Sequence, residues 1–72
     1  NKEFFLKLKE LHPNLSKQEI EKCGLIRLNF SNKEIAQIKN ISIQSARNAK
    51  HRIRKKLNLG ENITLENYLE GI

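Results

Sequence analysis

The sequence predicts an all-α fold of five short helices. Apolar residues recur at intervals of three and four residues along the chain, which is the spacing of one helix face. Valine, which is enriched in strands, is absent. A serine followed three residues later by a glutamate occurs twice, which is the pattern of a capping box at a helix start.

The first helix is predicted over residues 3–12. Pro13 ends it, because the residue before a proline is disfavoured in the helical conformation. Its apolar stripe consists of Phe4, Phe5, Leu8 and Leu11.

The second helix is predicted to begin after the capping box of Ser16 and Glu19 and to end at Asn29. Its apolar side contains Ile20, Cys23, Leu25 and Ile26. We expect Cys23 to be a core residue, because no histidine–carboxylate pair accompanies it at a catalytic spacing.

Ser31 and Glu34 form the second capping box, before a helix predicted over residues 32–39. This helix is expected to bury Ile35, Ala36 and Ile38. Asn40 can end it in the left-handed conformation, and Ser42 can cap the next helix. Two helices joined by a turn of about three residues form a helix-turn-helix.

The fourth helix is predicted over residues 43–58 and has two contrasting faces. A narrow apolar stripe is formed by Ala46, Ala49, Ile53 and Leu57. The opposite face is polar and consists of Gln44, Asn48, His51 and Lys55, flanked by Arg47, Arg52 and Arg54. A last helix is predicted after Thr64, with its apolar side formed by Leu65, Tyr68, Leu69 and Ile72.

Charge is concentrated on part of this small domain. The 72 residues contain 14 Lys and Arg against 8 Asp and Glu, a net charge of +6. No acid occurs between Glu34 and Glu61, where seven cations are found: Lys39, Arg47, Lys50, Arg52, Arg54, Lys55 and Lys56. This block indicates a surface that binds a polyanion, and a solvated helix face is the alternative.

Enzyme, metal and membrane functions have little support in the sequence. One cysteine and two histidines are too few for a tetrahedral zinc site, and the three glycines form no phosphate-binding loop. We therefore expect no metal, no cofactor and no enzymatic activity. No run of ten apolar residues occurs, so we expect no membrane contact by this chain. The first residue is Asn1 and methionine is absent, so we expect a piece of a longer protein.

The polar face of the fourth helix suits the major groove of DNA. Arginine can bridge O6 and N7 of guanine, and asparagine or glutamine can bridge N6 and N7 of adenine. The residues near the start of a recognition helix usually reach the bases. The predicted base-reading residues are Gln44, Arg47, Asn48 and His51.

Phosphate contacts are predicted further along the fourth helix and at two helix starts. Lys50, Arg54 and Lys55 are the candidates on the fourth helix, and Arg52 is left unassigned. Helix N-termini bind anions through free N–H groups and the helix dipole. This adds Ser31, Asn32, Lys33, Ser42 and Ser45. A capping role without any phosphate contact is the alternative for each serine.

Residues 15–59 resemble the LuxR-type (GerE-like) helix-turn-helix domain of bacterial transcription regulators. The matching residues are Leu15, Ser16 and Glu19, then Cys23 and Ile26, then Ser31-Asn32-Lys33-Glu34-Ile35-Ala36, and then Ile41-Ser42, Ser45, Ile53 and Lys56-Leu57. The chain departs from the family at Ser45-Ala46, where Thr-Val is usual, and at Asn29 and Asn40, where glycine is frequent.

The resemblance implies a compact four-helix domain over residues 15–72, of the winged-helix-like DNA-binding class, with residues 1–14 as an extra N-terminal helix that serves as a linker or brace. It implies that residues 43–58 enter the major groove, with base contacts from the positions of Arg47, Asn48 and His51. The expected setting is the C-terminal output domain of a cytoplasmic regulator, with an upstream sensory domain and contact with RNA polymerase.

The resemblance further implies a homodimer through the last helix, with an interface at Leu65, Leu69 and Ile72. Packing of these residues on the first helix of the same chain is the alternative. Two other functions stay open: a promoter-recognition region like that of bacterial sigma factors, and a protein-interaction module with a helix-turn-helix shape that docks an acidic partner.

Overall fold

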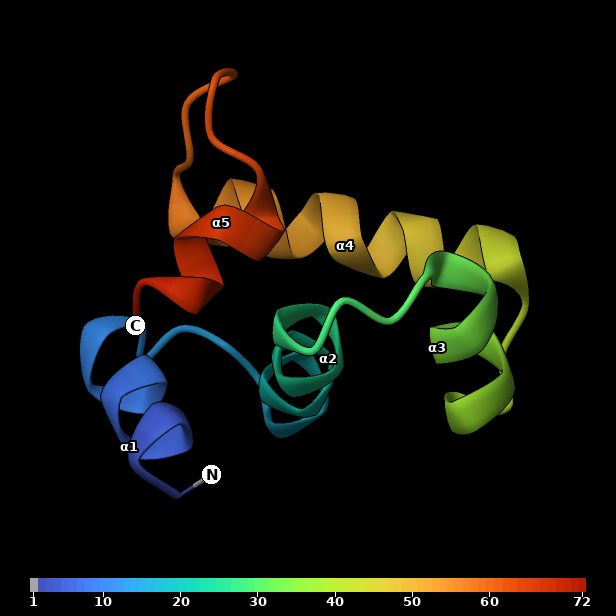
Figure 1. Cartoon of the computed structure of the whole chain (residues 1–72), viewed down its shortest axis with the longest axis horizontal. Helices are drawn as coiled ribbons and strands as arrows, with labels where there is room; N and C mark the ends of the chain where they lie inside the picture. Colours follow the sequence, from blue (N-terminus) through green and yellow to red (C-terminus); the bar gives the residue numbers. More distant parts are fainter. Residues whose placement is uncertain (1) are drawn as a thin grey trace.

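The computed structural model describes residues 2–72, and these residues contain helices and no strand. This described part forms five helices in order: α1 (Lys2–Leu11), α2 (Lys17–Arg27), α3 (Asn32–Lys39), α4 (Ile43–Leu57) and α5 (Leu65–Glu70) (Figure 1). The predicted all-α fold is confirmed, and the predicted helix ends differ from the observed ones by at most two residues.

Two capping boxes begin α2 and α3 with the same geometry. The backbone N–H groups of Glu19 and Glu34 donate to the hydroxyls of Ser16 and Ser31, each at 3.1 Å. The two carboxylates accept from the backbone N–H groups of the same serines at 2.8 Å. The predicted boxes are therefore confirmed, and each satisfies two backbone donors that the helix itself leaves unpaired.

Three asparagines close α2, α3 and α4 in the left-handed conformation. Asn29, Asn40 and Asn58 have φ angles of 65°, 55° and 56°. The N–H of the residue after each asparagine donates to a carbonyl five residues earlier: Phe30 to Leu25, Ile41 to Ala36 and Leu59 to Arg54. Phe30, Ile41 and Leu59 then pack against the core. These are the bonds and the apolar contact of a Schellman motif, and asparagine supplies the backbone conformation that glycine more often adopts there.

Three helices, α1, α4 and α5, pack against α2. α1 and α5 lie against α2, while α3 packs against the first part of α4. α4 is the longest helix and runs along the length of the molecule, with α3 at its N-terminal end and α5 near its C-terminal end (Figure 1). The apolar stripe of α4 is buried as predicted, so the opposite face of this helix is free.

Two residues that were predicted to be in the core are exposed. Leu11 is 58% exposed and Ile38 is 52% exposed. α1 contacts the core through Phe4, Phe5 and Leu8, and its last turn extends beyond them. In α3, Ile35 and Ala36 are buried, and Ile38 lies about 110° around the helix from the middle of that pair.

Candidate nucleic-acid interface

α3, the turn at residues 40–42 and α4 form a helix-turn-helix. Ser42 caps α4: its hydroxyl accepts from the backbone N–H of Ser45 at 3.0 Å. The same hydroxyl also donates to the hydroxyl of Ser45 at 2.9 Å. Ser42 and Ser45, two of the predicted phosphate contacts, are therefore paired with each other at the start of this helix.

One face of α4 is fully open to solvent. Its six residues are all exposed: Gln44, Arg47, Asn48, His51, Arg52 and Lys55. The face is open because the buried stripe of Ala46, Ala49, Ile53 and Leu57 lies on the opposite side of the same helix. The structure thus brings together the four predicted base-reading residues with Lys55 and Arg52. We call this set of six residues the α4 face.

The cations of α4 fall into two groups. Lys56 forms an ion pair with Glu19 at 2.8 Å, and Lys50 forms one with Glu66. The guanidinium of Arg54 donates to the backbone carbonyls of Ile63 at 2.8 Å and Gly60 at 3.1 Å. These three cations hold α4 to the start of α2, to α5 and to the loop before α5.

Three other cations of α4 have no partner among residues 2–72: Arg47, Arg52 and Lys55. All three belong to the α4 face. Of the α4 cations predicted to contact phosphate, Lys55 is thus exposed and unpartnered in the described chain, whereas Lys50 and Arg54 are engaged on the α5 side. Because α4 has no acidic residue, the uncompensated positive charge of the α4 face is set by these three side chains.

Glu19 and Glu66, the acids that pair with Lys56 and Lys50, stay ionised in neutral solution. Partial burial favours the neutral carboxyl of Glu19, but hydrogen bonds from Lys56 and Ser16 outweigh it and hold the pKa of Glu19 below its usual value. Partial burial acts in the same direction on Glu66, and the hydrogen bond and charge of Lys50 help to keep the pKa of Glu66 low as well.

These two low pKa values predict a loss of stability in acid. A carboxylate whose pKa is lower in the folded state stabilises the fold above its unfolded pKa, near 4.5, and loses that contribution as the pH falls through the folded value. The melting temperature is therefore expected to fall as the pH drops below about 4.5. Thermal melts from neutral pH into acid measure this effect. The double variant Glu19→Gln, Glu66→Gln should show a shallower fall, and an equally steep fall would contradict the prediction.

The start of α3 was also predicted to contact phosphate through Ser31, Asn32 and Lys33. The hydroxyl of Ser31 accepts from Glu34, so the serine acts as a cap in the structure. The backbone N–H of Ser31 and then its hydroxyl hold the pKa of Glu34 below its usual value, so an ionised carboxylate lies at this helix end. Asn32 is partly buried, and Lys33 is exposed without a partner in the described residues. Lys33 is thus the residue of this set with an uncompensated charge.

Leu65, Leu69 and Ile72, the residues predicted to form a dimer interface, pack against other parts of the same chain. Leu65 and Leu69 are 1% and 0% exposed, inside the core of the single chain, and Ile72 is partly buried. Leu65 and Leu69 are thus core residues of the single chain, and a homodimer through α5 stays a prediction. They pack within the chain, where α5 lies mainly against α2 and not against the first helix that the alternative named.

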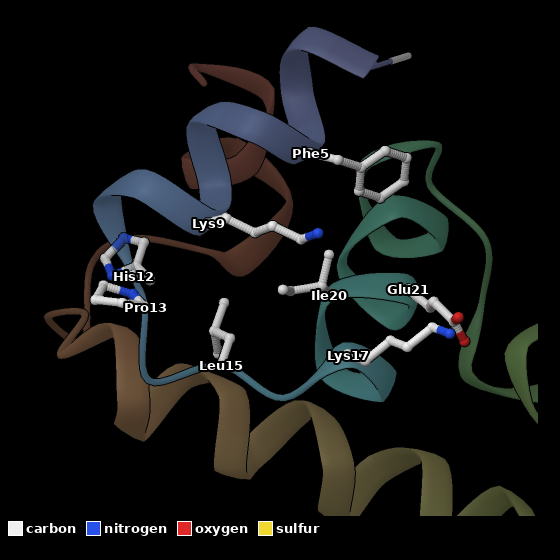
Figure 2. Close-up of a pocket in the computed structure, with 8 residues that line it drawn as sticks. All are labelled: Phe5, Lys9, His12, Pro13, Leu15, Lys17, Ile20 and Glu21. Atoms are coloured by element: carbon white, nitrogen blue, oxygen red, sulfur yellow. The ribbon is translucent and has the colours of Figure 1, made fainter.

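A groove of about 600 Å³ lies between α1 and α2. Figure 2 shows Lys9 reaching from α1 toward Ile20 of α2, with Leu15 below them. At the upper end of the groove Phe5 packs against α2 at Gly24, where an added Cβ would lie 2.8 Å from the Cζ atom of Phe5. No residue of α4 lines this groove, so it is separate from the α4 face.

The chain was compared with protein-family models, with curated proteins and with solved structures, and none of the three comparisons finds a match. Within residues 2–72, no helix combines the length and the apolar character that crossing a membrane requires.

Proposed function

We propose that the chain binds double-stranded DNA in a sequence-specific manner, with α4 in the major groove. The observation that carries this proposal is the α4 face, which presents amide, guanidinium, imidazole and ammonium groups on a helix that has no carboxylate. We propose further that this is the output domain of a LuxR-type bacterial transcription regulator in the cytoplasm, in agreement with the sequence resemblance.

The dimensions of α4 suit this role. The major groove is about 12 Å wide and admits one α-helix. α4 has 15 residues and is therefore about 22 Å long. The first turns carry Gln44, Arg47 and Asn48, and His51 follows one turn later. In helix-turn-helix proteins the N-terminal part of the second helix reaches the base edges, while the first helix crosses the backbone. α3, with Lys33 exposed at its start, has the position of that first helix.

The phosphate contacts predict a change in salt dependence. Lys55→Ala should weaken binding to all duplexes and lower the slope of log K against log salt concentration by about one unit, because one fewer counterion is released. Fluorescence anisotropy titrations at several salt concentrations measure the slope. Lys7→Ala on α1 removes the same charge away from α4 and should leave the slope unchanged. An unchanged slope for Lys55→Ala would exclude this lysine from the phosphate contacts.

Selection from a randomised duplex DNA library at physiological salt tests the proposed function. An enriched motif supports sequence-specific binding, and a two-fold repeat in it indicates a dimer with a fixed half-site spacing. A motif bound only together with RNA polymerase would favour the sigma-factor-like alternative. No enrichment, with binding that disappears as salt rises, would contradict the proposal and favour the protein-interaction module.

A further inference from the structure

A small hollow lies at the C-terminal end of α4, and we call it the α4 hollow. Its volume is about 280 Å³, and it is lined by His51, Arg54, Lys55, Asn58 and Leu59. These residues belong to the last two turns of α4 and to the two positions that follow it. Three of the lining side chains are basic, one is an amide and none is a carboxylate.

The α4 hollow differs in charge from the other concave places on the described surface. The groove between α1 and α2 includes Glu21, and so does a hollow between α2 and α3. A hollow between α1 and α5 includes Glu10. A carboxylate in each of these three linings would repel an anion. Of these four places, the α4 hollow is therefore the one that fits an anionic group.

Two backbone carbonyls hold the guanidinium of Arg54 in place. Nη1 donates to the carbonyl of Ile63 at 2.8 Å, and Nη2 donates to the carbonyl of Gly60 at 3.1 Å. Because the guanidinium is planar and is bound at both terminal nitrogens, these bonds restrain its rotation. They use two of its five N–H donors and leave three for a ligand. Arg54 can thus serve the loop before α5 and the α4 hollow together.

His51 and Lys55 add donors that have no partner among residues 2–72, and both side chains are exposed. An imidazole keeps at least one N–H in every protonation state, an ammonium has three, and the amide of Asn58 has two. The helix dipole opposes an anion at a C-terminal end with about half an elementary charge. The full charges of Arg54 and Lys55 exceed that, so the α4 hollow remains attractive to an anion.

We propose that the α4 hollow binds one phosphate group. Its donors come from four different side chains, which suits a tetrahedral group with several acceptor oxygens better than a planar carboxylate. This assigns His51 to a phosphate and not to a base, and it adds Arg54 to the residues that face the ligand. A phosphate of the DNA backbone is the source if the proposed function holds, and for that source the inference rests on it. A free phosphate compound has the same chemistry.

The first part of the experiment titrates the 72-residue chain with inorganic phosphate at constant ionic strength and follows the amide signals by NMR. Saturable shifts are expected for residues 51–59, including the side-chain amide of Asn58, and sodium chloride at the same ionic strength should not produce them. His51→Ala and Lys55→Gln should each weaken phosphate binding about five- to tenfold. Arg52→Gln removes a cation of the same helix outside the α4 hollow and should leave it unchanged.

The second part uses the duplex selected from the randomised library, with each backbone phosphate replaced in turn by a neutral methylphosphonate. One position is expected at which this replacement weakens binding of the unmodified chain about five- to tenfold. The loss at that position should disappear in His51→Ala and also in Lys55→Gln, because two groups that contact the same phosphate are coupled to it. Arg52→Gln should lower the overall affinity and keep the loss at that position.

The outcomes separate this inference from the proposed function. One backbone phosphate that depends on both His51 and Lys55 supports the inference and identifies DNA as its source. Saturable binding of inorganic phosphate without such a position also supports it and identifies a free phosphate compound. If inorganic phosphate shifts no signal of residues 51–59 and the two residues share no backbone phosphate, the inference is overturned while sequence-specific binding stands. If the library yields no motif, the proposed function is contradicted, and the phosphate titration alone decides on the α4 hollow.

Discussion

Replacing Ile53 by alanine is expected to lower the free energy of unfolding by about 2–5 kcal/mol. Ile53 is 0% exposed and lies in the middle of the buried stripe of α4. Truncation removes apolar contacts and leaves a cavity that the surrounding helices fill only in part. A domain of this size has a total stability of roughly 4–11 kcal/mol. The substitution should therefore remove a large share of the stability and displace the α4 face from its position.

Ile38→Ala is the matched control, because it makes the same truncation at a side chain that is 52% exposed. It should change the free energy of unfolding by no more than about 0.5 kcal/mol. Urea unfolding followed by far-ultraviolet circular dichroism measures both variants. Similar losses of unfolding free energy for Ile53→Ala and Ile38→Ala would show that the apolar stripe of α4 is not buried in the core.

The second large effect is expected for Arg47→Ala, which should weaken binding to the selected duplex about 5- to 150-fold relative to random duplex. Arg47 is exposed at the start of α4 and has no partner among the described residues, so its guanidinium is free to bridge a guanine. Competition titrations with both duplexes measure the ratio of the two affinities, which separates base reading from attraction to phosphate.

Arg52→Ala removes the same charge from the same helix and serves as its control. Arg52 lies further from the start of α4, so we expect both affinities to fall together and their ratio to persist. If Arg47→Ala also leaves the ratio unchanged, Arg47 contacts only phosphate. The circular dichroism spectra of both variants should match that of the unmodified chain, because both side chains are exposed.

Local features explain why the helices and their ends could be predicted. The hydroxyl of Ser31 and the carboxylate of Glu34 satisfy backbone donors within three residues of themselves, and Asn40 adopts its left-handed conformation with bonds to α3 alone. Such interactions need no distant partner. Asn58 has the same conformation and ends α4 one residue earlier than predicted. Like Asn29 and Asn40, Asn58 is followed by an apolar residue, and this shared pattern would have predicted that α4 ends before Asn58.

The functional roles within the basic block could not be predicted in the same way. Lys50, Arg54 and Lys55 were all predicted to contact phosphate because they are cations of one helix. In the structure Lys50 pairs with Glu66, and Arg54 donates to the carbonyls of residues 60 and 63. At 100° per residue Lys50 lies about 20° from the edge of the buried stripe, a signal for its use within the fold, whereas Arg54 lies about 60° from that edge and has no such signal. Their partners nevertheless become known only once α5 is placed against α2.

The all-α class, both capping boxes and the contrast between the two faces of α4 could be predicted from the sequence, because each depends on residues within a turn or two of one another. The burial of Leu65 and Leu69 in the core and the ion pairs of Glu19 and Glu66 with two lysines of α4 depend on the packing of distant helices. The same packing brings the hydroxyl oxygen of Tyr68 to 2.5 Å from Nε2 of His12, which lies 56 residues earlier in the sequence. Burial and ion pairing depend on which helices meet, and the packing of α1 and α5 on α2 settles that for this chain.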